Sequence, residues 1–333
     1  MQNDLDHLTV IDMDAGELFS GSPSGRMIKG FSAPCSFTPR LDPDYLFHDS
    51  MREIVVWLLT APAERADPLY IFGPTGSGKT SLVRQLAARL NYPVFDVTGH
   101  GRLEFPDLAG HLAVHNGSMT FQYGPLALAM RYGGIFLLNE MDLLDPATAT
   151  GLNGVLDGGP LCIPENGGEI IHPHPMFRLV ATANTNGASD DSGLYQGTLR
   201  QNIALMDRFW LCEVGYPASI TEESLLERVA PAIPSDIRKT MVSFANEVRR
   251  LFVGESDTQK HGETIEVTFS TRTLIRWATL TIRFQPLARQ NIQPIRYALD
   301  RALGYRASRE TRAMLHELAQ RMFPAAEATT NTP

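Results

Sequence analysis

The sequence is poor in cysteine, lacks a long hydrophobic run and has no excess of basic charge, and each shortage excludes a class of protein. Its three cysteines, Cys35, Cys162 and Cys212, lie far apart in the 333 residues, which argues against a disulfide framework or a zinc site. No apolar run reaches the roughly 18–20 residues that cross a bilayer. The acidic start MQNDLDHLTV is unlike a signal peptide. We therefore expect a soluble, cytoplasmic protein with no membrane partner.

The charge balance argues against a protein whose whole surface binds nucleic acid. There are 29 Lys and Arg against 37 Asp and Glu, a net charge of −8. Nine arginines lie between Arg272 and Arg312 and could form a local basic patch. They lack regularly interleaved aromatic residues, so solvated helix faces and contacts between subunits are the favoured interpretation. A nucleic-acid partner is not expected.

Short apolar segments alternate with helical stretches from residue 69 to residue 214. The segments are rich in aliphatic or aromatic residues, and they comprise residues 69–72, 94–97, 135–138, 179–183 and 209–214. Such segments are typical of strands buried on both faces of a mostly parallel sheet. The chain between them is long enough for crossover helices, so the pattern predicts an open α/β fold.

The remaining segments define the domain organisation. Residues 1–40 have no sustained period and are interpreted as an extended or partly mobile arm. Residues 41–216 are interpreted as the α/β core with hairpin insertions, and residues 325–333 as a polar tail. Residues 217–324 nearly lack strand signals and predict a small helical domain. Its helices are expected to begin near Ser219, in a capping box with Glu222, and near Ser235, Ser270, Pro294 and Ser308, with Gly254 ending the second.

The strongest motif is GPTGSGKT, which follows the first predicted core strand and opens a helix. A strand, a glycine-rich turn and a helix in this order form a phosphate-binding loop, whose backbone N–H groups surround phosphate oxygens. Lys79 is expected to reach the β- and γ-phosphates, and the Thr80 hydroxyl to hold Mg²⁺. The residues predicted to bind ATP are Gly73, Pro74, Thr75, Gly76, Ser77, Gly78, Lys79, Thr80 and Ser81.

Two further predicted strands end in polar residues that complete such a site. Glu140 follows the strand at 135–138 and is the candidate general base. Asn139 stands where such motifs carry Asp; its amide oxygen can serve the metal without adding negative charge, so weaker Mg²⁺ binding is expected. Asn184 follows the strand at 179–183 and either faces the γ-phosphate or forms a turn.

These motifs, with several others, resemble the MoxR branch of the AAA+ ATPases, and within it the CobS-type ATPase subunits of aerobic cobaltochelatase. The resemblance extends in the family's order over residues 41–323. It rests on the phosphate loop, Asn139-Glu140, Asn184 and the segments at residues 41–47, 107–110, 172–184, 193–197, 206–209 and 270–274.

The resemblance implies a ring, expected to be a homo-hexamer, with ATP at the interfaces between subunits. Arg208, in the segment Met-Asp-Arg-Phe, then corresponds to the arginine finger that reaches a neighbour's γ-phosphate, and Arg272 to the second sensor. Arg200 is a weaker finger candidate. Each arginine is otherwise an ordinary solvated or ion-paired residue, Arg208 with Asp207. A planar guanidinium suits both functional positions, because charge spreads over the equatorial oxygens during transfer.

Two segments predict hairpins that project toward a partner or a pore in this family. Residues 99–124 contain the turn signal Asn116-Gly117, followed by Phe121 and Tyr123, which either contact a partner or pack within the hairpin. Residues 161–175 form the second. His172 and His174 are two residues apart, so both would lie on the same face of a strand and could bind a metal ion. No third ligand is evident nearby, so a metal site is not favoured.

The leading hypothesis is therefore an ATPase that remodels a partner. If the chain is a true chelatase subunit, it is the motor of a cobaltochelatase. No cobalt or corrin site is evident in the sequence. Alternatives are a motor for a different von Willebrand A-domain partner and a nucleotide-gated scaffold with weak hydrolysis.

Overall fold

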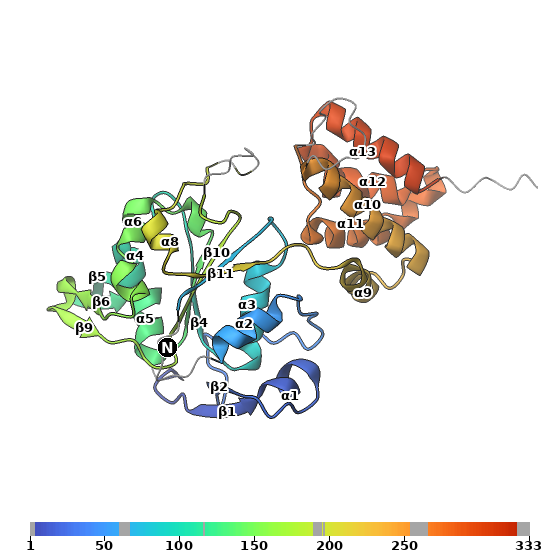
Figure 1. Ribbon diagram of the computed structural model, residues 1–333. Helices are drawn as coiled ribbons and strands as arrows, with labels where there is room; N and C mark the ends of the chain where they lie inside the picture. Colours follow the sequence, from blue (N-terminus) through green and yellow to red (C-terminus); the bar gives the residue numbers. More distant parts are fainter. Residues whose placement is uncertain are drawn as a thin grey trace, which may run out of the picture. The chain divides into compact units, whose positions relative to one another are not determined.

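A computed structural model describes residues 4–59, 67–115, 117–188, 195, 197–253 and 266–324. The chain divides into two units (Figure 1): an α/β unit, Met1–Pro74 with Gly78–Gly215, and a helical unit, Thr75–Ser77 with Tyr216–Pro333. None of the helices in the described part of the chain combines the length and the apolar character that spanning a bilayer requires.

A five-stranded sheet forms the centre of the α/β unit. Its order is β11-β3-β10-β7-β4, and every neighbouring pair is parallel. The strands are β3 (Leu69–Phe72), β4 (Val94–Thr98), β7 (Ile135–Asn139), β10 (Arg178–Ala183) and β11 (Trp210–Glu213). The predicted α/β fold and its parallel sheet are confirmed, with strand ends shifted by one residue at most.

The register of the sheet brings the carboxyl ends of its central strands to one edge. Phe72, the last residue of β3, lies opposite Ala183, the last of β10. Leu138 of β7 lies opposite Ala181 and Val97. The segments that follow β3, β7 and β10 therefore leave the sheet side by side, where open α/β sheets bind their ligands.

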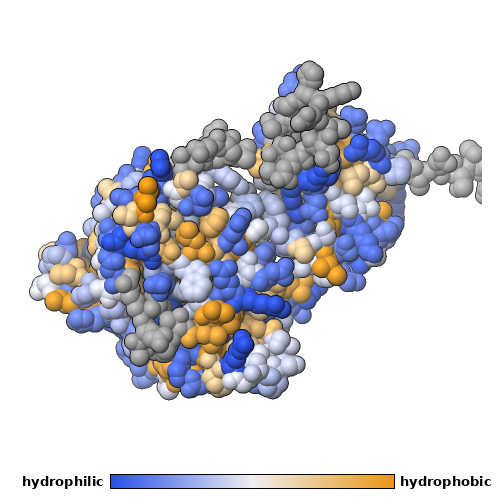
Figure 2. Space-filling view, viewed as in Figure 1, coloured by the Kyte–Doolittle hydropathy of each residue, from blue (hydrophilic) through white to orange (hydrophobic). Residues whose placement is uncertain are grey.

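Both predicted hairpins are present. Strand β5 (Gly110–His115) pairs with β6 (Ser118–Tyr123), and β8 (Leu161–Ile163) with β9 (Glu169–Ile171); Asn116, predicted in the first turn, lies outside the described residues. Val114 and Met119 are directly paired and largely exposed, and Ile170 of β9 is exposed as well. Apolar side chains therefore reach solvent on both hairpins, where orange atoms mark the surface around β5, β6 and β9 (Figure 2).

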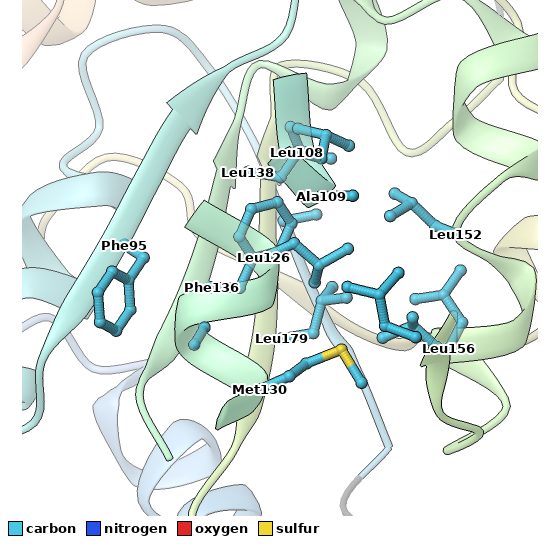
Figure 3. Packing of buried hydrophobic residues seen from close by; sticks show 14 of the residues in the cluster. Phe95, Leu108, Ala109, Leu126, Met130, Phe136, Leu138, Leu152, Leu156 and Leu179 are labelled. Carbon is cyan, nitrogen blue, oxygen red and sulfur yellow. The ribbon is translucent and has the colours of Figure 1, made fainter. Parts of the chain in front are cut away.

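Each face of the sheet is covered by its own apolar cluster, because successive strand residues point to opposite sides. Leu69 and Ile71 belong to the cluster that includes α2 (Met51–Leu58) and α3 (Lys79–Arg89), whereas Tyr70 belongs to the other. Figure 3 shows part of this second cluster, to which α4 (Phe105–Ala109), α5 (Pro125–Tyr132), α6 (Pro146–Thr150), α7 (Asn153–Leu156) and α8 (Ile203–Met206) contribute.

The expectation of an extended arm at residues 1–40 is wrong for the described part of that segment. Strands β1 (Val10–Asp14) and β2 (Met27–Phe31) form an antiparallel pair around α1 (Ala15–Ser20). Phe31 is buried and donates its N–H to the carbonyl of Leu90, which directly follows α3, so the pair is joined to the rest of the α/β unit. Charged residues interrupt both strands, Asp12 in β1 and Lys29 in β2, so neither shows the continuous apolar run by which the core strands were recognised.

The described residues of the helical unit form five α-helices around an aromatic core. They are α9 (Ser219–Val229), α10 (Ser235–Val253), α11 (Thr271–Arg283), α12 (Pro294–Ala302) and α13 (Arg309–Met322). Phe244, Phe269, Trp277 and Phe323 are all buried and contact one another edge-on or tilted. Aromatic contacts of this kind add roughly 0.5–1.5 kcal/mol beyond the burial of their area.

The predicted helix starts are mostly correct, with one instructive error. Ser270 caps α11 and Ser308 caps α13, each accepting a backbone N–H three residues on. The capping box of Ser219 and Glu222 does not exist: Ser219 is already helical, with Ala218 before it. Glu222 is instead fully buried in an ion pair, so tertiary pairing overrides the local signal. Gly254 lies outside the described residues.

Candidate functional site

The loop between β3 and α3 has a backbone that depends on glycine. Gly73, Gly76 and Gly78 have φ values of 144°, 70° and 101°, in the region that residues with a Cβ rarely adopt. At Gly73 a Cβ would also lie 2.2 Å from the Val214 carbonyl oxygen. The loop thereby turns directly into the N-terminus of α3, whose first residue is Lys79, so its N–H groups and the helix dipole favour an anion there.

Lys79 is buried and held over this loop. The residue is only 8% exposed. Its Nζ donates to the carbonyl oxygens of Gly73 (2.7 Å) and Pro74 (3.0 Å) and to Asn184 Oδ1 (3.2 Å). The structure thus places Asn184, after β10, beside the lysine of the loop after β3. These three acceptors are neutral, so an incoming phosphate offers the ammonium an acceptor of opposite charge and therefore a stronger bond.

Thr80 and Asn139 bring two oxygen atoms together. The Thr80 hydroxyl donates to Asn139 Oδ1 at 2.9 Å, and the Thr182 hydroxyl reaches the same oxygen at 3.3 Å. Hydroxyl and amide oxygens are hard donors of the kind Mg²⁺ accepts when phosphate and water complete its shell. The pair therefore fits a magnesium ion, although neither side chain carries a charge.

Glu140 follows β7 in a strained backbone conformation. Its φ of 54° is positive, and its side chain is exposed. The other described non-glycine residues with positive φ, Asn91 and Asn291, are asparagines, which tolerate that region. For a glutamate it costs on the order of 1–2 kcal/mol. Such strain persists at functional sites, and sequence reasoning cannot detect it.

Asp142 is a residue of this edge that the sequence analysis missed. It is fully buried, and its Oδ2 accepts N–H bonds from Asn184 (2.8 Å) and Thr185 (3.2 Å). Tyr70 donates its hydroxyl to the Thr185 carbonyl, and burial together with the nearby Asp142 raises the pKa of that phenol. These bonds fix the backbone turn that presents the Asn184 side chain. The sequence analysis missed Asp142 because an acidic residue that follows a strand is usually solvated, and nothing in the sequence marks this one as buried.

Arg208 lies at the other end of the sheet. Trp210, two residues on, pairs with Leu69 at the start of β3, so Arg208 is at the amino edge rather than at its own phosphate loop. Its guanidinium binds Asp157 through Nε (2.9 Å) and Nη2 (3.2 Å). The sequence had suggested Asp207 as the alternative ion-pair partner; the structure places Asp157 there. Arg200 is exposed.

Arg272 lies in the first turn of α11, exposed to solvent. Within the helical unit it lines a cavity of about 280 Å³ together with Glu266, Arg276 and Arg306. Burial, with the like charge of Arg276, lowers the pKa of Arg306. The cavity is therefore rich in guanidinium groups, and an anion is the ligand its charge favours.

The structure shows which contacts hold the aromatic residues of the first hairpin and His174. The Tyr123 hydroxyl donates to Glu169 Oε2 at 2.7 Å, and its ring lies under the Arg131 guanidinium and meets the Phe121 ring edge-on. Both aromatic residues are half-buried and pack inward, against the second hairpin and the apolar core of the α/β unit. His174 accepts the Met176 N–H, and among the described residues no group of three or more His, Cys, Asp or Glu could hold a metal ion.

The fold and the loop define a phosphate-loop nucleotide-binding protein, and comparisons with known proteins specify it. Residues 68–209 match the family described as AAA domain (dynein-related subfamily), and residues 222–322 match the CbbQ/NirQ/NorQ C-terminal family.

Among curated proteins, the chain is 30% identical to aerobic cobaltochelatase subunit CobS of Sinorhizobium sp over 284 residues, covering 83% of this chain and 82% of CobS. It is 32% identical to denitrification regulatory protein NirQ of Stutzerimonas stutzeri over 184 residues, covering 55% of this chain and 64% of NirQ. Among solved structures, an alanine-to-serine mutant of RuvB from Thermotoga maritima superposes with a TM-score of 0.50 at 14% identity, covering 79% of this chain and 72% of that chain.

The chain belongs to the MoxR-type AAA+ ATPases, related to CobS and NirQ. The resemblance found in the sequence is thereby confirmed, and the family implies nucleotide binding, typically with Mg²⁺. The RuvB superposition supports the AAA+ fold alone.

Proposed function

We propose that the chain hydrolyses ATP as one subunit of a homo-oligomeric ring, expected to be a hexamer in the cytoplasm, and uses the energy to remodel a partner protein. The observation that carries this proposal is the convergence of Lys79, Thr80, Asn139 and Asn184 at one edge of the sheet, with Glu140 following directly on β7. Residues from three strands meet only because their carboxyl ends are in register.

Each residue of this edge has a distinct task in the proposed reaction. The loop from Gly73 to Gly78 and Lys79 hold the phosphates of ATP, and Lys79 exchanges its neutral acceptors for phosphate oxygens. Thr80 and Asn139 would hold Mg²⁺, which neutralises charge on the β- and γ-phosphates when bound. Glu140 takes a proton from the attacking water. Asn184, fixed by Asp142, orients that water or the γ-phosphate.

Two arginines act from elsewhere in the ring. Arg208, at the edge of the sheet away from its own phosphate loop, stabilises the γ-phosphate bound by the neighbouring subunit. Arg272, exposed among other guanidinium groups of the helical unit, contacts the phosphates as the second sensor. Both stabilise charge that develops on the phosphoryl oxygens during transfer.

Two substitutions test the core of this proposal. Lys79→Ala should abolish ATP binding in a calorimetric titration; an unchanged affinity would remove the phosphate loop from the site. Glu140→Gln keeps the size of the side chain but cannot take a proton, so ATP should bind and rings should assemble while turnover falls about 10²–10⁴-fold. Hydrolysis at the parent rate would place the general base elsewhere.

The partner is proposed from the relatives. Similarity to CobS over most of both chains supports a chelatase partner, with cobalt insertion into a corrin ring carried out on other subunits. The match to the CbbQ/NirQ/NorQ C-terminal family and the similarity to NirQ show that the relatives are not confined to chelatase subunits, so a second candidate is a different partner, for which we propose a von Willebrand A-domain protein. ATP-dependent cobalt insertion after addition of chelatase subunits supports the first; retained ATPase activity without insertion supports the second.

A further inference from the structure

The Arg208 side chain is held from two directions. Asp157, the residue that follows α7, binds the Nε and Nη2 atoms side-on, at 2.9 and 3.2 Å. Nη1 donates to the Ala204 carbonyl oxygen within α8 at 2.5 Å. Asp157 lies 51 residues before Arg208 in the chain, so two separate elements fix one guanidinium.

These contacts leave part of the guanidinium for another ligand. A guanidinium has five N–H donors in a planar fork. The Asp157 and Ala204 bonds occupy three of them, which leaves two for a ligand beyond those contacts. The side chain is 28% exposed, so the group is neither fully solvated nor sealed in the core. Arg208 can therefore bind a phosphate without giving up the contacts that orient it.

We propose that Asp157 is a positioning residue that fixes the Arg208 guanidinium for a phosphate of the ATP bound by the neighbouring subunit. This inference rests on the proposed function, since it takes Arg208 as the arginine finger. Its physical basis is orientation: a long, rotamer-rich side chain held in one geometry before the neighbour arrives loses less entropy on binding.

An alternative is that Asp157 restrains Arg208 and must release it before hydrolysis. Release would be required if Asp157 occupied the whole fork, but a side-on carboxylate takes only two donors. The two interpretations predict opposite effects, because loss of a restraint accelerates hydrolysis and loss of a positioning contact slows it.

Asp207 provides a matched control. It lines the same hollow of about 490 Å³ as Asp157 and Arg208 and is exposed. Asp207→Asn therefore removes the same formal charge from the same surface while leaving the carboxylate that binds Arg208. A difference between the Asp157 and Asp207 variants reports orientation rather than the local potential.

The experiment compares Asp157→Ala and Asp207→Asn in full-length rings. We expect Asp157→Ala to bind ATP with unchanged affinity and to lose about 10–100-fold in kcat, as expected for a misplaced catalytic group, and Asp207→Asn to stay within twofold of the parent. The double variant Asp157→Ala with Arg208→Ala should be no slower than Arg208→Ala alone, because both changes remove one interaction. Additive losses, a parent rate or a faster rate for Asp157→Ala would each overturn the inference.

Mixed rings locate the defect on one side of the interface. Asp157→Ala subunits mixed with Lys79→Ala subunits form interfaces with an intact phosphate loop and an intact finger, so activity should rise above that of either variant. Mixtures with Arg208→Ala subunits contain no whole interface and should show no such rise; a rise there would contradict the assignment. If Arg208→Ala itself hydrolyses ATP at the parent rate, the finger assignment fails; if it is inactive while Asp157→Ala is normal, only the positioning inference fails.

Discussion

The α/β unit and the helical unit each bury a cation, but they satisfy it in different ways. Lys79 of the α/β unit donates to two backbone carbonyls and one amide oxygen. Arg249 of the helical unit binds both carboxylate oxygens of the fully buried Glu222 at 2.8 Å, and its Nε donates to the Phe269 carbonyl. A phosphate that replaces the neutral acceptors of Lys79 adds a favourable charge interaction. An anion that replaced Glu222 at Arg249 would only exchange one negative charge for another. The first cation is therefore suited to ligand binding and the second to holding helices together.

The largest expected effect concerns a third cation, Arg208, which we propose acts between subunits. Removal of a finger that acts in trans costs roughly 10³–10⁵ in rate in phosphoryl-transfer enzymes. Arg208→Ala should therefore bind ATP almost normally in calorimetry and lose hydrolysis in a steady-state assay. Arg228→Ala, an exposed arginine near the end of α9, is the matched control and should hydrolyse ATP at the parent rate.

Mixing Arg208→Ala with Lys79→Ala subunits sharpens this prediction. Interfaces that pair the phosphate loop of the first chain with the finger of the second are whole, so activity should return. Mixed rings, verified by native mass spectrometry, that stay inactive at every ratio would argue against a trans finger at Arg208, and Arg200 would be tested next.

The second prediction breaks the buried pair of the helical unit. Glu222→Ala leaves Arg249 uncompensated in the core, and such a change destabilises by about 3–5 kcal/mol. Thr271 also loses the acceptor of its hydroxyl, at 2.6 Å. Chemical denaturation should show this loss in the helical unit. The neighbouring acid is the control: Glu223→Ala should change stability by less than about 0.5 kcal/mol, and equal losses would contradict a special role for the pair.

The features that local sequence patterns determine, the core strands and the polar residues that follow them, were predictable from the sequence. The apolar segments gave the strands of the parallel sheet, and GPTGSGKT, Asn139, Glu140 and Asn184 gave the polar residues at its carboxyl edge, because parallel strands end on the same side. Contacts between distant segments were not predictable. Asp157 meets Arg208 across 51 residues, and Asp142 supports Asn184 only after both strands have paired.

The errors have the same cause. Ser219 and Glu222 have the spacing of a capping box, but Glu222 gains more from Arg249, 27 residues away, than from a local backbone N–H. The β1–β2 pair was missed because its core contacts, the burial of Ile28 and Phe31 against the rest of the α/β unit, are made with distant segments of the chain. Tertiary burial, which sequence alone does not contain, determined each outcome.

The third prediction concerns the neutral amide oxygen of Asn139, at the proposed Mg²⁺ position. Asn139→Asp adds a negative charge beside Thr80 without changing size, and ligand charge raises the affinity for divalent cations. The Mg²⁺ concentration for half-maximal ATPase activity should fall by about tenfold, equivalent to about 1.4 kcal/mol. A titration with an unchanged midpoint would mean that residue 139 does not influence the metal.

The smallest expected effect lies at the start of α13, where Glu266 accepts the Thr311 hydroxyl and the Ser308 N–H. These bonds favour the charged form and lower the pKa of Glu266 from 4.5 to about 2. A carboxyl whose pKa is lower in the folded state stabilises the fold above its unfolded value, and this contribution is lost as the pH falls toward 2. Because the group is mostly solvated, the contribution should stay below about 1 kcal/mol.

Glu266→Gln should therefore be less stable than the parent near neutral pH in chemical denaturation, and the difference should shrink as the pH is lowered through about 4 toward 2. Glu310→Gln removes a charge from the same helix start without these two bonds. If its stability shows the same dependence on pH, the effect belongs to the helix dipole rather than to the Glu266 contacts.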